Sequence, residues 1–327
     1  MSRLRQGSGA HVRALVLTAG LGTRLRPLTY VRAKAAVPVN GEPLARRVVR
    51  WLVSHGITEQ VLNLHHHPHT ITRLIGDGSD LGARVRYSWE NPVLGSAGGP
   101  RHALDLLAGP RDSFLLVNGD TLTNVDVAAV LARHESSGAR VTMALIPNPH
   151  PDKYGGVQVS DDGYVTGFSR AGAAQQSWHF IGVQAARAET FAALPDGVPA
   201  ESVNMLYRQL IERHPCAIAA FTCDASFRDI GTPADYLRTS VELAAEEGDR
   251  LAAGARLNCA PSARVVRTAL WDDVTIGERA DLADCIVGDG ARIPSHARYE
   301  RCAIVAAHGR AASPGERLDG DLLVAPI

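Results

Sequence analysis

Residues 12–34, VRALVLTAGLGTRLRPLTYVRAK, change abruptly from an apolar run to a polar, cationic loop. The run VRALVLTA predicts a strand that is buried on both faces. The loop after it carries two glycines and four cations, namely Gly20, Gly22, Arg24, Arg26, Arg32 and Lys34. Because a loop that only reverses the chain does not need this charge, we infer that it binds an anion.

The sequence of this loop excludes two common phosphate-binding motifs. A P-loop ends in GK[ST], which is absent here, and a dinucleotide fingerprint needs a third glycine where Leu25 stands. The longer pattern GxGTRxxP, followed by a lysine and placed after a strand, is much more specific than a bare GxG. Parallel sheets bind ligands at the carboxyl ends of such strands.

The first two thirds of the chain alternate short apolar runs with helical patterns. The predicted strands are ALVLTA, QVLNL, RVRYS, FLLVNGD and VTMALI, and the predicted helices cover 43–56, 68–78, 98–109 and 126–138. A hairpin closed by Asp162-Gly163, two further strands and a helix over 233–248 complete a domain that we assign to residues 11–248. The alternation predicts an α/β fold with a mixed, mainly parallel sheet between two helical layers.

Beyond about residue 250, apolar residues recur every six positions. Ile276 and Leu282 are six apart and, after a slip of one residue, so are Val287, Ile293, Tyr299 and Val305. This period predicts a short left-handed β-helix of the hexapeptide type over 252–310, with room for about two coils. An irregular, strand-rich segment is the alternative. The tail over 311–327 is rich in Gly, Ala and Pro, and we expect it to be loosely ordered.

The composition predicts a soluble, cytoplasmic protein. Lys+Arg and Asp+Glu both number 34, so no overall field attracts nucleic acid or a membrane, and we expect neither as a partner. The first ten residues do not resemble a signal peptide, and no apolar run approaches 18 residues. Five cysteines without a CxxC pair are expected to be reduced thiols.

The opening pattern resembles the sugar-1-phosphate nucleotidyltransferases. The resemblance rests on Ala19-Gly20-Leu21-Gly22-Thr23-Arg24, then Pro27 and Lys34, and it continues to about residue 245 through LLVNGD, KYGG and FRDIGTPADYL. It implies a Rossmann-like, three-layer nucleotidyltransferase domain. It also implies an enzyme that joins an NTP and a sugar 1-phosphate with the help of Mg²⁺, releasing pyrophosphate and an NDP-sugar.

The resemblance implies a catalytic centre of cations and carboxylates. Arg24 would contact the pyrophosphate, Lys34 the α-phosphate, and Asp120 and Asp229 would hold the metal, with Asp120 also counted as catalytic. Fixed positive charge suits a reaction in which two polyanions meet. The alternatives are a helix cap for Asp120, although Asp126 suits that role better, and a turn residue for Asp229. Arg26 and Arg32 are expected to be solvated.

The nucleoside and the sugar are expected on either side of this centre. The implied nucleotide-binding residues are Ala19, Gly20, Gly22, Thr23, Glu90, Gly95 and Gly98, of which the last two would let the backbone approach the base and Glu90 would orient their loop. On the sugar side, Gly155 belongs to KYGG. Many members have Glu-Lys-Pro where this chain has Phe168-Ser169-Arg170, so Arg170 or His179 would replace the missing lysine.

The substrates remain open between two subgroups. FRDIGTPADYL and the repeat region favour a mannose-1-phosphate guanylyltransferase, whereas Phe180-Ile181-Gly182 and RYSxE favour an N-acetylmuramate-1-phosphate uridylyltransferase or another uridylyl- or thymidylyltransferase. A non-catalytic, nucleotide-sugar-binding regulatory subunit is the rival of another class, but it would be expected to lose the catalytic residues. We expect that the chain can form a homo-oligomer, and that the run His65–His69 is a polar loop and no metal site.

Overall fold

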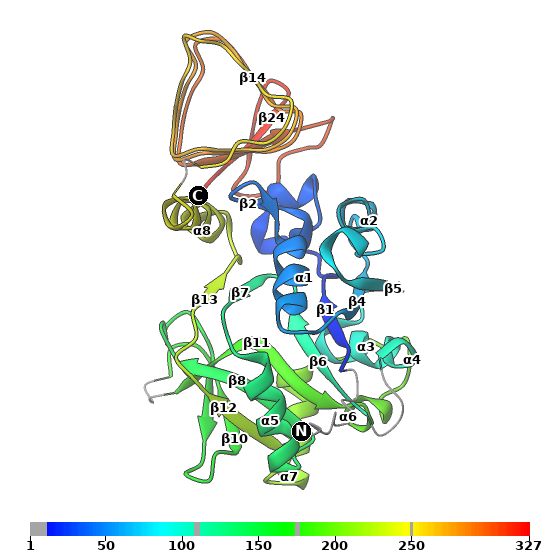
Figure 1. Ribbon diagram of the computed structural model, residues 1–327. Helices are drawn as coiled ribbons and strands as arrows, with labels where there is room; N and C mark the ends of the chain where they lie inside the picture. The colour runs from blue at the N-terminus through cyan, green and yellow to red at the C-terminus, as the bar shows by residue number, and fades with distance from the viewer. Residues whose placement is uncertain (1–11, 108–111, 174–176, 249–250) are drawn as a thin grey trace, which may run out of the picture.

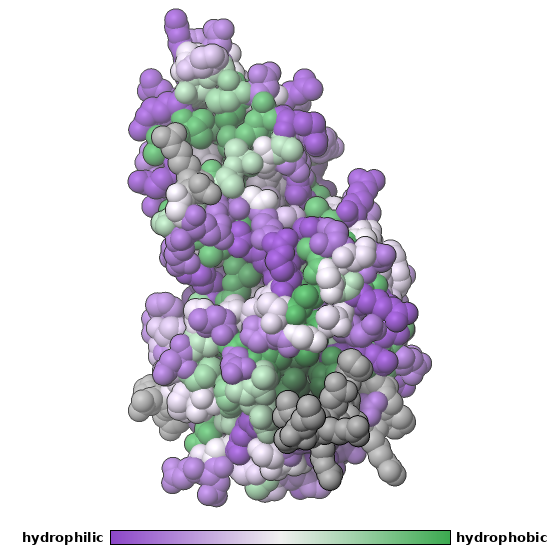
Figure 2. All heavy atoms as spheres, in the orientation of Figure 1, coloured by the Kyte–Doolittle hydropathy of each residue, from purple (hydrophilic) through white to green (hydrophobic). Residues whose placement is uncertain are grey.

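The computed structural model describes residues 12–107, 112–173, 177–248 and 251–327. A helix-covered sheet forms one end of the molecule and a triangular coil of short strands forms the other, with the blue N-terminal loop between them (Figure 1). The visible face is largely hydrophilic, with apolar side chains exposed in two areas, one on the coil and one over the sheet domain (Figure 2). In the described parts of the chain, no helix has the length and apolarity needed to cross a membrane.

The sheet of the first domain has nine strands and is mixed, as the sequence predicts. Its order is β10-β9-β11-β6-β1-β4-β5, and β8 pairs with both β11 and β12. Strands β1, β4, β5 and β6 are parallel, while β11 runs antiparallel to β6. The bounds are β1 Ala14–Leu17, β4 Glu59–Leu64, β5 Arg84–Trp89, β6 Ser113–Asn118, β8 Val141–Pro147, β9 Gly156–Val159, β10 Val165–Ser169, β11 Trp178–Arg187 and β12 Ile218–Thr222.

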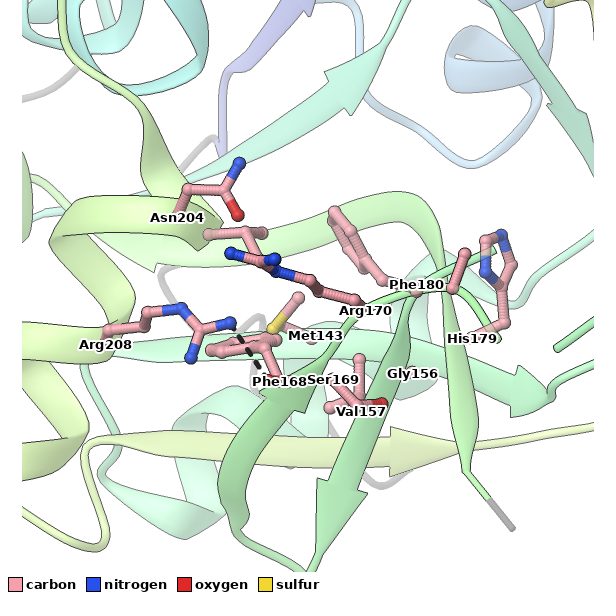
Figure 3. Close-up of a pocket in the computed structure, with 13 residues that line it drawn as sticks. Met143, Gly156, Val157, Phe168, Ser169, Arg170, His179, Phe180, Asn204 and Arg208 are labelled. Atoms are coloured by element: carbon pink, nitrogen blue, oxygen red, sulfur yellow. Dashed lines mark hydrogen bonds between the residues drawn. The ribbon is translucent and has the colours of Figure 1, made fainter. Parts of the chain in front are cut away.

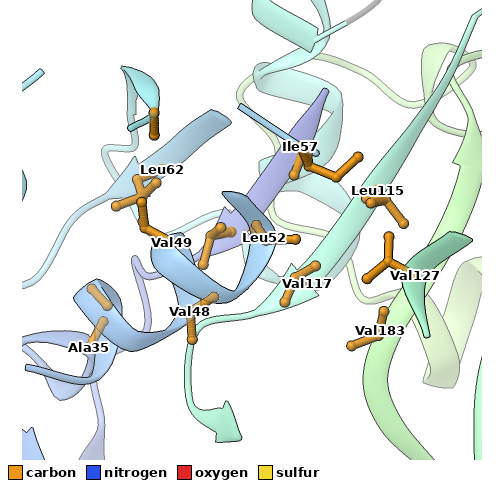
Figure 4. Packing of buried hydrophobic residues seen from close by; sticks show 14 of the residues in the cluster. Ala35, Val48, Val49, Leu52, Ile57, Leu62, Leu115, Val117, Val127 and Val183 are labelled. Atoms are coloured by element: carbon orange, nitrogen blue, oxygen red, sulfur yellow. The ribbon is translucent and has the colours of Figure 1, made fainter. Parts of the chain in front are cut away.

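Helices cover both faces of this sheet because its strands are apolar on both sides. Val16 and Val117 point to one layer, and Leu15 and Leu116 point to the other. Figure 4 shows the first layer, in which Val48, Val49 and Leu52 of α1 pack onto the sheet. Each face therefore buries its own core, which explains why the strands do not alternate with polar residues.

The helices match the predictions except around residue 103. The predicted helix over 98–109 is two helices, α3 and α4, and its last two residues lie outside the described part of the chain. The sequence analysis did not predict α6 or α7. The bounds are α1 Leu44–Ser54, α2 Pro68–Ile75, α3 Gly95–His102, α4 Leu104–Leu107, α5 Val127–Ser137, α6 Glu189–Ala192, α7 Tyr207–Arg213 and α8 Pro233–Glu246.

The C-terminal region is a β-helix with three parallel strands on each of three faces. Two faces consist of β14 Asn258–Cys259, β17 Thr275–Ile276 and β20 Arg292–Ile293, and of β15 Arg264–Val266, β18 Asp281–Ala283 and β21 Arg298–Glu300. The third contains β16 Ala269–Leu270, β19 Ile286–Val287 and β22 Cys302–Ala306. The expectation of about two coils was therefore too low.

The slip in the six-residue period reflects the length of one coil. Strand partners such as Asp281 and Arg298 are 17 residues apart, so two sides contribute six residues and one contributes five. The interior stack accordingly continues from Val287 to Ile304. The sequence predicted Val305 at this position, which is wrong. Val305 instead packs against the first domain.

The last residues are ordered, so the prediction of a loose tail is wrong. Strand β24 Leu322–Pro326 pairs antiparallel with β22, and β23 Arg317–Asp319 pairs with β24. Leu322, Leu323 and Val324 are buried. The apolar residues of the tail allow it to form a buried strand, despite its Gly and Pro content. All five cysteines are free, as expected.

Candidate active site

The opening loop, residues 18–37, leaves β1 at the carboxyl edge of the sheet. Gly22 has φ +60°, and a Cβ there would lie 2.7 Å from Thr29 Cγ2 and 3.2 Å from Lys34 Cβ. The Thr29 hydroxyl donates to the Gly22 carbonyl at 2.9 Å. The glycine thus lets the two ends of the loop pack together, which brings Thr23 and Arg24 near Lys34.

Lys34 contacts Asp120 directly. Its Nζ lies 2.5 Å from Asp120 Oδ2, and the two side chains are 13 % and 29 % exposed. Both residues line a cavity of about 240 Å³. Because this ion pair borders a cavity, a phosphate entering the cavity can exchange with the carboxylate as the partner of the ammonium group.

Asp229 lies beside Asp120 on a two-stranded ribbon. Strand β13 Phe227–Asp229 pairs antiparallel with β7 Thr121–Thr123, so Asp229 is opposite Thr121. Burial raises the pKa of Asp229, and the Asp120 charge raises it further, while Lys34 and Arg24 act in the opposite direction. A Cβ at Gly231 would lie 2.7 Å from Asp229 Oδ2 and 3.3 Å from Arg24 Nη1. The four predicted catalytic residues therefore converge.

This donor set fits Mg²⁺. Magnesium is bound through one or two carboxylates together with phosphate oxygens and water. Burial raises the pKa of Asp229 and the Asp120 carboxylate raises it further, so a cation bound between the two carboxylates would stabilise their charged forms. In the described residues, no group of three or more His, Cys, Asp or Glu side chains could hold a metal by itself, so phosphate oxygens would have to complete the site.

The wall of the 240 Å³ cavity includes Ala19, Gly20, Glu90 and Gly95. Glu90 is buried and its carboxylate is fully used, since Oε1 accepts from Asn63 Nδ2 at 2.6 Å and Oε2 accepts from Leu94 N at 2.7 Å. Asn63 Oδ1 in turn accepts from Thr18 N at 2.6 Å. Glu90 thus orients the loop, as predicted, and Asn63 links it to the start of the opening loop. The sequence analysis missed Asn63.

Gly98 packs closely against a neighbouring segment. A Cβ there would lie 2.6 Å from the Val198 carbonyl and 3.2 Å from Ala200 N, and Gly98 N donates to Ala200 O. A Cβ at Gly95 would lie 2.8 Å from the same Ala200 carbonyl oxygen, and Gly95 also lines the cavity. Gly98 is thus required for packing of α3 against the segment before the Ser202–Leu206 helical turn, and its contact with a base stays a prediction.

A second cavity of about 900 Å³ contains all three predicted sugar-binding residues. Gly155, Arg170 and His179 line it together with Phe180 and Arg208. In Figure 3 the Arg170 guanidinium points between Asn204 and Arg208, while His179 lies at the opposite end. Arg208 donates to the Phe168 carbonyl at 2.9 Å. The Arg170 guanidinium makes no hydrogen bond or ion pair with any described residue.

His179 is neutral and buried. Burial lowers the pKa of His179 to about 4, and the nearby Gly155 backbone acts in the opposite direction. The two groups do not have the geometry of a hydrogen bond. Its ring packs 4.4 Å from Tyr154 and 4.6 Å from Phe227, centroid to centroid. Neither ring nitrogen has a partner among the described residues. His179 can therefore donate or accept a hydrogen bond but cannot supply the missing lysine's charge.

The family comparisons agree with this geometry. The model of the family described as nucleotidyl transferase matches residues 13–246. The chain belongs to the nucleotidyl transferase family. The resemblance to sugar-1-phosphate nucleotidyltransferases and the expected enzyme class are therefore confirmed, while the roles of single residues stay predictions.

Two curated relatives and one solved structure illustrate the match of this nucleotidyl transferase. Mannose-1-phosphate guanylyltransferase of Mycobacterium tuberculosis is 27 % identical over 89 % of this chain and 83 % of its own length. N-acetylmuramate alpha-1-phosphate uridylyltransferase of Neisseria meningitidis is 35 % identical over 60 % of this chain and 82 % of its own. The crystal structure of HddC from Yersinia pseudotuberculosis shares the fold, with a TM-score of 0.61 and 21 % identity. The match covers 71 % of this chain and 99 % of the HddC chain.

Of the two loop arginines that are expected to be solvated, Arg32 differs from its predicted setting and Arg26 does not. Arg26 is exposed, as expected, and lies over the Tyr30 ring. Arg32 is only 12 % exposed and pairs with Asp272 and Asp289, so the prediction of a solvated charge is wrong. The histidine run binds backbone, since His65 Nδ1 contacts Glu90 O and His66 Nε2 contacts Thr29 O.

Asp126 is the helix cap that the sequence predicts. Its carboxylate accepts from Ala129 N at 3.1 Å at the start of α5. Asp120 is thus not needed as a cap and remains available to the catalytic centre.

Proposed function

We propose that this nucleotidyl transferase joins GTP and mannose 1-phosphate to give GDP-mannose and pyrophosphate. The observation that carries the proposal is the convergence of Lys34 and Arg24 with Asp120 and Asp229 beside a cavity. The choice of substrates is supported by the Mycobacterium tuberculosis relative, which matches 89 % of this chain, a share that extends into the β-helix.

In this proposal, a sugar-phosphate oxygen attacks the α-phosphorus and the bond to the bridging oxygen of the pyrophosphate breaks. Lys34 leaves Asp120 to bind the α-phosphate, and Arg24 neutralises charge on the departing pyrophosphate. Asp120 and Asp229 would hold Mg²⁺, which supplies the positive charge that two side chains alone do not provide. The protein contributes mainly positioning and fixed charge.

The proposal is tested by measuring pyrophosphate release from four NTPs against a panel of sugar 1-phosphates with Mg²⁺. The expected result is a kcat/KM that is highest for GTP with mannose 1-phosphate. Equal or higher values for another pair would reassign the substrates within the class. No release from any pair would favour a non-catalytic, nucleotide-sugar-binding regulatory subunit.

A second candidate is the transfer of a uridylyl group to N-acetylmuramate 1-phosphate. The observation that favours it is Arg170 in the 900 Å³ cavity, which has no hydrogen-bond or ion-pair partner among the described residues and lies near Arg208, because two cations there suit a sugar with an additional anionic group. The relative of that name is 35 % identical. Arg170→Ala should lower kcat/KM selectively for an acidic sugar if this candidate is right, and should leave the preference among neutral sugars unchanged.

We further propose that the protein works in the cytoplasm, where nucleoside triphosphates are abundant. The five free thiols are compatible with a reducing compartment.

A further inference from the structure

The opening loop depends on side-chain contacts for its position. Its backbone hydrogen bonds are short-range, such as Leu25 N to Gly22 O and Val37 N to Lys34 O. The loop thus has no ladder to a neighbouring strand between β1 and the short β2 Pro38–Val39. Its fully buried side chains Leu25 and Leu28 belong to a cluster shared with the β-helix, which contributes Trp271, Ile286 and Val305.

Arg32 connects this loop to two successive coils of the β-helix. Arg32 Nε lies 2.6 Å from Asp289 Oδ2, and Nη2 lies 2.6 Å from both Asp289 Oδ1 and Asp272 Oδ2. The two aspartates are 17 residues apart, which is the length of one coil, so they stack one above the other. The geometry at Asp289 is the bidentate fork that arginine forms and lysine cannot.

The aspartates are themselves fixed by backbone groups of the β-helix. Asp272 Oδ1 accepts from Ala255 N at 2.7 Å, and Asp289 Oδ1 accepts from Asp272 N at 3.1 Å. The Arg32 guanidinium also lies 5.4 Å from the centre of the Trp271 ring. Trp271 Nε1 donates to the Tyr236 hydroxyl at 2.8 Å, and that hydroxyl donates to the Pro38 carbonyl at the end of the loop. The network therefore holds Arg32 and also Pro38, the residue that follows the loop.

Only one residue separates Arg32 from Lys34. That residue, Ala33, is fully buried, and its N–H donates to Thr70 Oγ1 at 3.1 Å. The 3₁₀ turn Lys34–Ala36 follows directly. Arg32, Ala33 and Lys34 therefore form one short segment, which the β-helix holds at Arg32 and Thr70 holds at Ala33.

We propose that Arg32 is a positioning residue whose attachment to the β-helix holds Lys34 in its catalytic place. The proposal rests on the proposed function for its kinetic consequences. In this protein, the β-helix is part of the support of the active site.

The first test is the kinetics of Arg32→Gln with Mg²⁺ and the best substrate pair. The expected result is a 10- to 100-fold lower kcat with both KM values within threefold of wild type, since a misplacement of about 1 Å reduces rates on this scale. Arg32→Lys should recover part of the loss, because lysine can contact one carboxylate at a time. Adding Asp289→Asn to Arg32→Gln should cause no further loss, because both remove the same contact.

Arg267→Gln is the matched control. Arg267 pairs with Asp284, 17 residues further along, through the same two-point contact, but its guanidinium is 62 % exposed and is not paired with the loop. Its kcat should stay within twofold of wild type. Rates are compared well below the melting temperature of each variant, so a lower kcat is not a loss of folded protein. A kcat for folded Arg32→Gln within twofold of wild type would overturn the proposal.

The second test does not need activity. The chain has only two lysines, Lys34 and Lys153, so acetylation of each can be followed by mass spectrometry. Arg32→Gln should increase the rate of Lys34 acetylation at least threefold relative to Lys153, and Arg267→Gln should not. If the wild type is inactive with every substrate pair, the proposed function fails and this measurement still decides the present proposal. An unchanged Lys34 rate would refute it.

Discussion

Lys34 and Arg32 lie two residues apart and both pair with aspartates, but they face different regions of the molecule. The Lys34–Asp120 pair borders a cavity next to a second carboxylate whose pKa is raised. The Arg32 pairs are enclosed between the loop and the β-helix, and backbone N–H groups fix their carboxylates. The comparison indicates that an ion pair is available for chemistry where a ligand can replace one partner, and supports structure where every partner is occupied.

The comparison predicts, first, that the cavity carboxylates carry activity rather than stability. Asp120→Ala and Asp229→Ala should each abolish pyrophosphate release at saturating Mg²⁺, because the proposed metal loses a ligand, while the melting temperature measured by circular dichroism stays near wild type. Asp126→Ala is the control. It removes a helix cap worth about 1 kcal/mol but should keep the turnover. A near-normal rate in either cavity variant contradicts the assignment.

The second prediction concerns the loop cation at the cavity. Lys34→Ala should lower kcat by about 10²–10³, the effect of losing one preorganised charge-stabilising donor. Arg26→Ala, in the same loop but exposed and packed on Tyr30, should stay within about twofold of wild type. Steady-state pyrophosphate release measures both. If the two variants lost activity equally, the general charge of the loop would matter and not the place of Lys34.

The free energy of unfolding should show the reverse order, because the Arg32 pairs support structure and the cavity carboxylates do not. Asp289→Ala leaves the enclosed Arg32 guanidinium with one carboxylate and should lower the free energy of unfolding by about 2–3 kcal/mol, below the range for a fully buried pair because Asp289 is 26 % exposed. Asp284 is equally exposed, but its partner Arg267 is 62 % exposed where Arg32 is 12 % exposed, so Asp284→Ala should cost less than about 1 kcal/mol. Urea unfolding of both variants makes the comparison. Equal losses would mean that the Arg32 site is an ordinary surface pair.

The smallest expected effect is a pH dependence that comes from neither ion pair. Burial of His134 between Ser113 and Thr142 lowers its pKa to about 4, against about 6.5 in the unfolded chain. Between these values the unfolded state binds a proton that the folded state does not, so this contribution is complete above pH 6.5 and is lost as the pH falls toward 4. His134→Gln should flatten the decline in unfolding free energy between pH 7 and 5. Some decline should remain, because the pKa of His179 is lowered similarly.

The sequence predicted the residues of the catalytic centre better than the contacts that hold the opening loop in place. Arg24, Lys34, Asp120 and Asp229 belong to motifs at strand ends, and parallel strands bring such ends together. Arg32 belongs to no motif, and its partners Asp272 and Asp289 are more than 200 residues away. No pattern in the loop reveals such a contact. A carboxylate pair 17 residues apart in the repeat region was the available signal, but it needs the coil length to be recognised.

The packing role of Gly98 and the role of Asn63 were not predicted from the sequence, for a related reason. A glycine in a small-residue loop suggests freedom around a ligand, but the segment at Val198–Ala200 also packs closely against Gly98. Asn63 is a polar residue at the end of an apolar strand, and its bonds to Thr18 and Glu90 depend on three neighbouring elements. Only tertiary structure distinguishes these roles.

The constant 17-residue register of the β-helix also limits which changes in chain length the protein can accept. Asp272 and Asp289 stack because the single coil that connects them is 17 residues long. Insertion of a single residue between them would turn the later carboxylate away from Arg32 and move the buried stack out of line. Point changes on the exposed sides leave that alignment intact, so evolution in this region should proceed by substitution or by whole coils.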